Sequence, residues 1–276
     1  MAWHAKLQLD YTHEAGRSVA RFAHDGPLRI LQSLWPEGDA VCHNVLVHPP
    51  GGLVGGDTLD ITMSVAAGAH GLVTTPGASR FYRSEGEPAV QRTHVTLAAG
   101  ARLEWLPLEA LYYSGCRAEN HLVMDLQPGA ELLGWDVAAL GLPQADQPFE
   151  RGEVQQHIEL RGAWLERARI AADDTRLMDG PLGLAGQRCM ATLFFACGEP
   201  IARTRREAIL DAAREVIASH PLAASSGATA PGPHVIVVRV LAPLVEPALA
   251  LLKAVRRAWR PLVWNLPAHE PRGWAI

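Results

Sequence analysis

Four acidic residues within or beside strand-like, otherwise apolar stretches are the best candidates for chemistry: Asp57, Glu104, Asp136 and Glu166. Glu104 and Glu166 each follow a Gly-Ala pair by three residues. Acids spread out in this way do not form the tight cluster of three or four ligands that a permanent metal site needs. Alternatively, each acid faces solvent or pairs with an arginine; the candidate arginines are Arg80, Arg83, Arg102, Arg117 and Arg167.

The glycine-rich segment from His48 to Asp57, HPPGGLVGGD, does not fit a nucleotide-binding loop. A phosphate loop needs a lysine after its glycines, whereas an acid follows here and repels phosphate. A dinucleotide loop opens a helix, whereas the alternating, β-branched residues after Asp57 predict a strand. The prolines predict an extended approach and the glycines a tight reversal or close backbone approach. A structural corner fits this pattern, but it leaves open why Asp57 stands at the mouth of a strand in an apolar body.

Signatures of nucleophilic or metal-dependent catalysis are missing from the sequence, which has neither G-x-S-x-G nor H-E-x-x-H. On a strand, Cys42 and His48 share one face and His43 takes the other, so the three do not converge on a permanent metal site. The four cysteines form no C-x-x-C pair, which predicts free buried thiols at Cys42, Cys116, Cys189 and Cys197. A carbohydrate-active β-helix enzyme would need an aromatic-lined groove, and aromatic residues make up only 6% of the chain.

The overall composition is that of a folded protein without a strong charge. Of the 276 residues, 48% are hydrophobic, and the net charge is −4. This balance excludes global disorder and gives no electrostatic reason to bind nucleic acid or anionic lipid. The most apolar region, from His234 to Leu252, is interrupted by Arg239, Pro243, Glu246 and Pro247, so it predicts a core segment rather than a membrane span. Without a secretory signal pattern at the N-terminus, we expect a cytoplasmic protein.

A loose internal repeat positions the acids. Gly-Ala pairs begin at Gly68, Gly100, Gly129 and Gly162, spaced by 32, 29 and 33 residues, and each pair lies between two alternating apolar runs. Each unit therefore predicts a strand, a tight turn and a second strand. Units of this size must stack to bury their apolar faces. The expected fold is mainly β, with stacked strands of β-helix-like character or an ordinary sandwich.

Helices are expected only in the C-terminal third, at about residues 204–220 and 243–260. The first has an apolar stripe and Thr204 as a candidate N-cap, and the second is expected to stop at Pro261. Between them we expect a Gly/Pro/Ser loop and then a strand at 234–241. No composition break divides the chain, so we expect one domain, 1–276, with a β body at about 1–200 and 234–241.

Six segments, in order along nearly the whole chain, resemble one protein family: LVHPPGGLVGGDTLDI, LVTTPGASRFYRSEGEPAVQ, LEWLPLEALYYSGCRAE, LLGWDVAALGLP, WLERARI and RPLVWNLPAHEPRGWAI. The family is that of the urease accessory protein D (UreD, also UreH). The chain departs from the family pattern at Leu108, at Ser114-Gly115-Cys116 and after Gly227-Ala228-Thr229, which leaves the roles of those positions open.

The resemblance implies a stacked β fold with two helices and a non-enzymatic scaffold. It further implies partners UreF, the GTPase UreG and the urease structural subunits, no permanently bound cofactor, and Ni²⁺ in transit through an internal tunnel. Carried over by position, the tunnel residues are Asp57, Ser79, Asp136 and Glu166. A structural adaptor without a metal path is the alternative.

Three expectations concern particular side chains on this reading. A buried carboxylate without a partner is costly, so Asp57 should border a water-filled cavity. Ser79 should point inward, and Tyr82 should be largely buried. The tryptophan-bearing C-terminal tail should either pack back on the body or dock a partner; partner docking, near an F-type protein, is the preferred reading for Trp259, Trp264 and Trp274.

Overall fold

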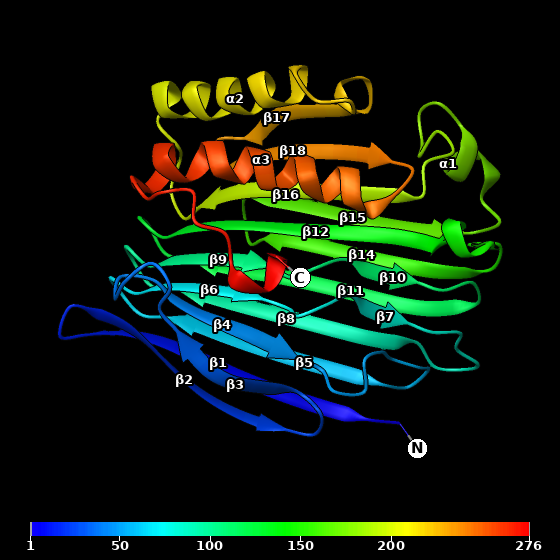
Figure 1. Ribbon diagram of the computed structural model, residues 1–276, viewed down its shortest axis with the longest axis horizontal. Helices are drawn as coiled ribbons and strands as arrows, with labels where there is room; N and C mark the ends of the chain where they lie inside the picture. The colour runs from blue at the N-terminus through cyan, green and yellow to red at the C-terminus, as the bar shows by residue number, and fades with distance from the viewer. Residues whose placement is uncertain (1, 276) are drawn as a thin grey trace.

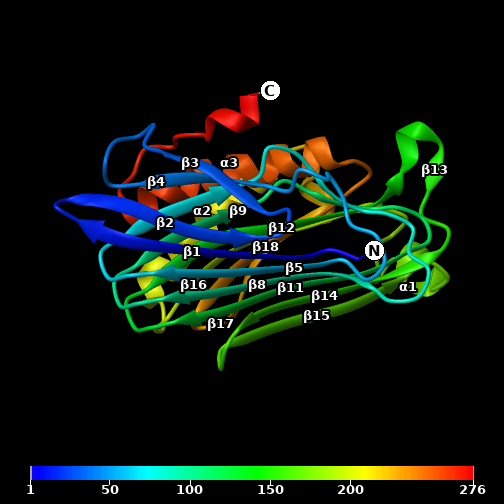
Figure 2. The ribbon, with the colours of Figure 1, turned by 90° about the horizontal axis from the view of Figure 1, so that it is seen from below.

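The computed structural model describes residues 2–275 and has two β-sheets, one behind the other, with helices α2 (Arg203–Ala218) and α3 (Val245–Trp264) covering the outer face of the second sheet (Figures 1 and 2). The mainly β, stacked architecture expected from the repeat is confirmed. A short helix α1 (Thr175–Asp179) was not expected. Asp174 begins it by accepting a hydrogen bond from the backbone N–H of Leu177.

The first sheet has seven strands and the second has eleven. The order in the first sheet is β15 (Trp164–Ala171), β14 (Gly152–Leu160), β11 (Cys116–Leu126), β8 (Ala89–Leu97), β5 (Thr58–Val65), β1 (His4–Glu14) and β2 (Arg17–Asp25). The main order in the second is β17 (Ser226–Gly232), β18 (Val235–Ala242), β16 (Cys189–Cys197), β12 (Glu131–Leu142), β9 (Arg102–Leu106), β6 (His70–Thr74), β4 (Cys42–Val47) and β3 (Arg29–Leu34). Beside this path, β10 (Ala110–Tyr112) pairs with β12 and with β7 (Ser79–Phe81), and β13 (Gln147–Pro148) pairs with β12.

The Gly-Ala repeat sets the stacking of the coils. Thr58 lies beside Val90, and Ala89 lies beside Ala118, so the strand register repeats the 32- and 29-residue spacings. The first three Gly-Ala pairs form the corners where the chain crosses from the first sheet to the second. Their glycines have φ between +69° and +77°, the left-handed region that glycine tolerates.

The fourth Gly-Ala pair forms a different turn. Gly162 lies in a hairpin between β14 and β15, which pair antiparallel within the first sheet. The coil therefore ends at β14, and β15 becomes the sheet edge. Hairpin and corner use the same glycine conformation, so the repeat alone did not distinguish them.

Two hydrophobic cores result from the layers. One lies between the sheets and includes Leu9, Met63, Val95 and Met124. The other lies between the second sheet and the helices and includes Leu133, Phe195, Ile236 and Val255. Among residues 2–275, no helix is both long and apolar enough to span a membrane. All four cysteines are free and buried, as expected.

The C-terminal third corrects three expectations. Helix α2 forms where expected, but Ala202 precedes it without a side-chain cap, so the N-cap assignment of Thr204 was wrong. Helix α3 does not stop at Pro261 but continues to Trp264, whose burial holds the last turn although proline lacks an N–H. The expected loop contains edge strand β17, and its Pro231 is compatible with a strand that pairs on one side only.

Candidate functional site

A belt of polar side chains crosses the apolar space between the two sheets. Gln91, Asn120 and Gln156 lie side by side at one level of β8, β11 and β14. Asp136, Thr192 and Arg239 lie side by side at one level of β12, β16 and β18. Strand alternation turns both rows inward, because their neighbours along the second sheet, Trp135, Leu193 and Val238, pack on the helices. We call these six residues the polar belt: Gln91, Asn120, Gln156, Asp136, Thr192 and Arg239.

Asp136 is the central carboxylate of the belt. Asn120 Nδ2 donates to one of its oxygens at 2.8 Å, and Gln156 Nε2 donates to the other. Gln91 Nε2 donates in turn to Asn120 Oδ1 at 3.4 Å. Burial raises the pKa of Asp136 to about 6, with the negative charge of Glu166 adding to the effect. The residue lies deep between the sheets, although the residue as a whole keeps a small solvent-accessible surface.

Several polar atoms near the belt are buried without a hydrogen-bond partner among residues 2–275. They include Oε1 of Gln156, the hydroxyl of Tyr112, whose pKa is raised by burial and by the charge of Asp136, and Oγ1 of Thr93, one inward position further along β8. Buried polar atoms are normally satisfied by protein or by ordered water. Around a carboxylate, such atoms suit water molecules or the hydration shell of a cation.

Glu166 closes one end of the belt through an ion pair between the sheets. It stands on β15, and its two carboxylate oxygens accept from Arg239 on β18 at 3.0 and 2.6 Å. Its side chain is only 12% exposed, whereas that of Arg239 is 52% exposed. Burial raises the pKa of Glu166, and the guanidinium opposes that shift. Arg239 was not among the candidate arginines, and its strand is far from Glu166 in the sequence.

At the opposite end of the belt lies a cavity of about 220 Å³, lined by residues that include His48, Gly51, Ser79, Arg80 and Gln91. Ser79 is half-buried and lines the cavity, in agreement with its expected inward position. Burial lowers the pKa of His48. Tyr82 is only half-buried, beside Tyr113, because Phe81 takes the fully buried position on that strand.

Asp57 is buried as part of a corner. Its two oxygens accept hydrogen bonds from the backbone N–H groups of Trp3 at 2.7 Å and Val54 at 2.9 Å. The cavity is lined by His48 and Gly51 from the same loop but not by Asp57. The expectation of a cavity beside Asp57 was therefore wrong, because the cavity lies beside the start of the loop and backbone amides compensate the Asp57 charge instead. A role in metal transit stays a prediction.

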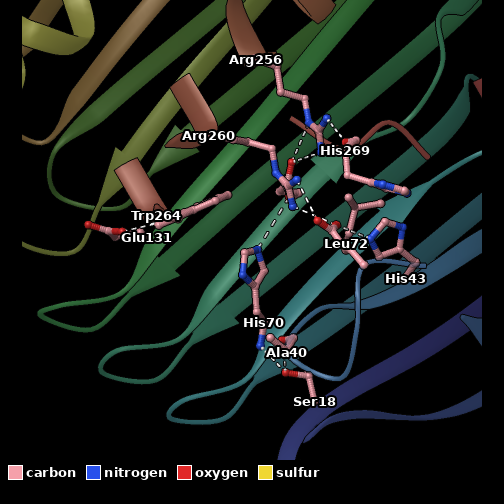
Figure 3. Close-up of polar contacts among 12 residues, drawn as sticks. Ser18, Ala40, His43, His70, Leu72, Glu131, Arg256, Arg260, Trp264 and His269 are labelled. Atoms are coloured by element: carbon pink, nitrogen blue, oxygen red, sulfur yellow. Dashed lines mark hydrogen bonds and ion pairs between the residues drawn. The ribbon is translucent and has the colours of Figure 1, made fainter. Parts of the chain in front are cut away.

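Glu104 faces away from the belt, into the layer between the second sheet and α3. Figure 3 shows Arg256 and Arg260 of α3 pointing into this layer, toward His70 and His43. Arg256 Nε donates to it at 2.7 Å and Arg260 Nε at 3.0 Å. Arg260 also donates to both oxygens of Glu37 at 2.9 Å, and His43 Nε2 lies 2.7 Å from Glu37. Sequence reasoning missed this site. One signal was present, because Arg256 and Arg260 are four residues apart on an otherwise apolar helix face.

The residues under α3, here called the arginine cluster, are Glu37, His43, His70, Glu104, Arg256 and Arg260. Two carboxylates meet two guanidiniums, so the charges balance. His70 Nε2 is 3.8 Å from Glu104, and burial lowers the pKa of His70, as does the charge of Arg260. Each charged group has a close partner, which indicates a structural role.

The tryptophans of the C-terminal segment pack on the body. Trp259 is fully buried and donates to the carbonyl of Ile209 at 2.9 Å. Trp264 donates to Glu131 at 2.7 Å, and Trp274 donates to Thr74 Oγ1 at 3.0 Å. This is the packing alternative considered above. Docking of a partner on this segment stays a prediction. Removing the segment after Pro261 would uncover buried side chains such as Trp264, so such a truncation should also destabilise the body.

A permanent metal cage has no candidate in the described part of the chain. No three His, Cys, Asp or Glu side chains among residues 2–275 are grouped closely enough to hold an ion. Asp136 and Glu166 are instead single carboxylates held by amides and by an arginine. Such positions suit transient rather than permanent contact with a cation.

Comparison with known proteins matches residues 4–275 to the model of the UreD urease accessory protein family. A urease accessory protein UreD of Polaromonas sp. (strain JS666 / ATCC BAA-500) is 66% identical over all of both chains. One from Variovorax paradoxus (strain S110) is 67% identical, again over all of both chains. One from Leptothrix cholodnii is 52% identical over 99% of each chain.

Proposed function

This chain belongs to the UreD family of urease accessory proteins, and we propose that it serves urease maturation as a non-enzymatic scaffold that helps deliver Ni²⁺ to apo-urease. Its partners in this proposal are UreF, the GTPase UreG and the urease structural subunits, in the cytoplasm. The route proposed for the ion is the polar belt, from the cavity at Ser79 past Asp136 to Glu166.

The observation that carries this proposal is the state of Asp136. The carboxylate lies deep between two sheets, and the side chains that donate to it within residues 2–275 are neutral amides. A buried acid with an arginine partner would repel a cation, whereas an amide-held acid attracts one without enclosing it. The amides and nearby unpartnered oxygens can replace part of a hydration shell. These features suit passage of a hydrated divalent cation.

A structural adaptor without a metal path is the second candidate. The observation that favours it is the ion pair of Glu166 with Arg239, which occupies both carboxylate oxygens and joins β15, the edge of the first sheet, to β18 of the second. On that reading the belt only fixes how the sheets face each other.

The proposal is tested by the variant Asp136→Asn, which removes the charge and keeps the shape. Apo-urease is activated with the accessory complex containing wild-type or variant protein, and bound nickel per active site is measured. We expect normal co-purification with UreF and UreG and a several-fold lower nickel content. The matched control is Asp125→Asn, on the outer face of β11, where Asp125 lies 2.6 Å from His94.

Full nickel loading with Asp136→Asn, at the wild-type rate, would contradict the transit route and favour the adaptor. Equal losses with both variants would show that the readout depends on general stability rather than on the belt.

A further inference from the structure

The ion pair between Glu166 and Arg239 joins a largely buried carboxylate to a guanidinium side chain that is exposed to solvent. The Glu166 side chain is 12% exposed, and both its oxygens are occupied by Arg239. The Arg239 side chain is 52% exposed, so its guanidinium remains partly hydrated. A pair of this kind can open from the outer side, because the arginine can be rehydrated without unpacking the core.

Open space beside Arg239 allows it to move. Its neighbour in the register of β17 is Gly227, which has no side chain, and a Cβ placed there would meet no atom within 4 Å. The strand β17 is an edge strand, with no further strand beyond it in the second sheet. The guanidinium can therefore swing outward over Gly227 while the backbone of β18 stays paired with β16.

We propose that Arg239 is the gate at the Glu166 end of the polar belt: in the closed state it neutralises Glu166 and bars cations, and in the open state it frees Glu166 as a carboxylate ligand. This inference rests on the proposed transit of Ni²⁺ along the belt. With Arg239 in place, a positive charge stands at the exit and repels a divalent cation. With Arg239 turned outward, the exit holds the carboxylates of Glu166 and Asp136.

The chemistry of the gate indicates what opens it. A guanidinium leaves one carboxylate most readily for another, because bidentate pairing preserves its hydrogen bonds. An acidic group on a docked partner, presented beside β17, would compete with Glu166 for Arg239. Opening would then be coupled to assembly, so that a cation could leave the belt only where an acceptor protein is docked.

The experiment measures Ni²⁺ binding to the full-length chain by equilibrium dialysis, with Ni²⁺ alone as the probe. In Arg239→Gln the guanidinium is lost and Glu166 is freed. We expect the apparent affinity to rise at least about tenfold, the low end of the effect of one adjacent opposite charge on proton binding by a carboxylate. The double variant Arg239→Gln/Glu166→Gln should return to the wild-type value. Arg167→Gln, an exposed arginine on the outer face of β15, is the matched control.

A structural ion pair would lower the melting temperature of Arg239→Gln without creating metal binding. Arg239→Lys keeps the charge but loses the bidentate contact, so it should show a smaller gain and provides a second test if the glutamine variant unfolds. No gain in folded Arg239→Gln or Arg239→Lys would overturn the gate.

The two proposals fail separately. Reduced nickel loading with Asp136→Asn, together with no gain in the Arg239 variants, would overturn the gate alone. Full loading of urease with both Asp136→Asn and Glu166→Gln would overturn the transit route itself.

Discussion

The polar belt and the arginine cluster both place charge inside an apolar body, but the buried carboxylates have different partners in the two regions. In the arginine cluster, Glu104 and Glu37 share two guanidiniums at 2.7 to 3.0 Å, and Arg256 and Arg260 are almost fully buried. In the belt, Asp136 is held by neutral amides. The carboxylates of the cluster are neutralised by guanidiniums, whereas the carboxylate of Asp136 has no cationic partner within hydrogen-bond distance among residues 2–275.

This difference separates stability from function. Removing one partner from a fully buried ion pair leaves an uncompensated charge, so the cluster is costly to disturb. An amide-held carboxylate can lose its charge without leaving an unpaired opposite charge. Changes in the cluster should therefore lower the free energy of unfolding, and changes in the belt should alter cation handling.

The largest effect is expected from the cluster. Arg260→Ala removes the group shared by Glu37 and Glu104 and should lower the free energy of unfolding by about 3–5 kcal/mol. The control is Arg257→Ala on the same helix, whose side chain is 61% exposed and paired with exposed Glu270. It should cost no more than about 1 kcal/mol. Urea denaturation checks both, and similar small losses for the two variants would remove the contrast between cluster and surface.

A smaller effect is expected at the glycine-rich corner. Asp57→Ala leaves the backbone N–H groups of Trp3 and Val54 without acceptors and should cost about 1–3 kcal/mol of stability. Asp60→Ala, at a more exposed position on β5, the strand that follows Asp57, is the control. Thermal unfolding of the two variants measures the difference, and an unchanged melting temperature for Asp57→Ala would argue that water replaces the carboxylate.

The smallest effect is a pH signature with opposite signs in the two regions. Although burial opposes ionisation, hydrogen bonds from His43 and Arg260 lower the pKa of Glu37 from 4.5 to about 2, so its contribution is present above pH 4.5 and lost as pH falls toward 2. Burial raises the pKa of Asp136 from 3.8 to about 6, so the folded state binds the proton more tightly, and stability falls as pH rises from 3.8 to 6.

In Asp136→Asn, the free energy of unfolding should therefore change less between pH 3.8 and 6 than in the wild type. The loss of stability below pH 4.5, which Glu37 governs, should remain. Urea denaturation at a series of pH values measures both changes. If the free energy of unfolding still decreases between pH 3.8 and 6 in the variant, a group other than Asp136 causes that decrease.

The sequence revealed the elements of the fold because they follow local rules. Alternation and the Gly-Ala spacing predicted the strands and their 32- and 29-residue register. The same alternation identified Asp136 and Glu166 as acids within strands. Neither pattern predicts which residues face each other between the two sheets or between a sheet and a helix. Arg239 is 73 residues from Glu166, and Arg260 is 223 residues from Glu37, so only the completed packing brings each pair together.

The position of α3 near the end of the chain has a consequence for synthesis. The outer face of the second sheet carries Leu133, Phe195 and Ile236, which α2 and α3 cover in the finished protein. During translation these strands leave the ribosome before residues 245–264, so the nascent chain exposes this apolar face until its last segment is made. Partly made chains with such a face are prone to aggregate. Premature termination upstream of α3 should therefore give insoluble product, even though every strand is present.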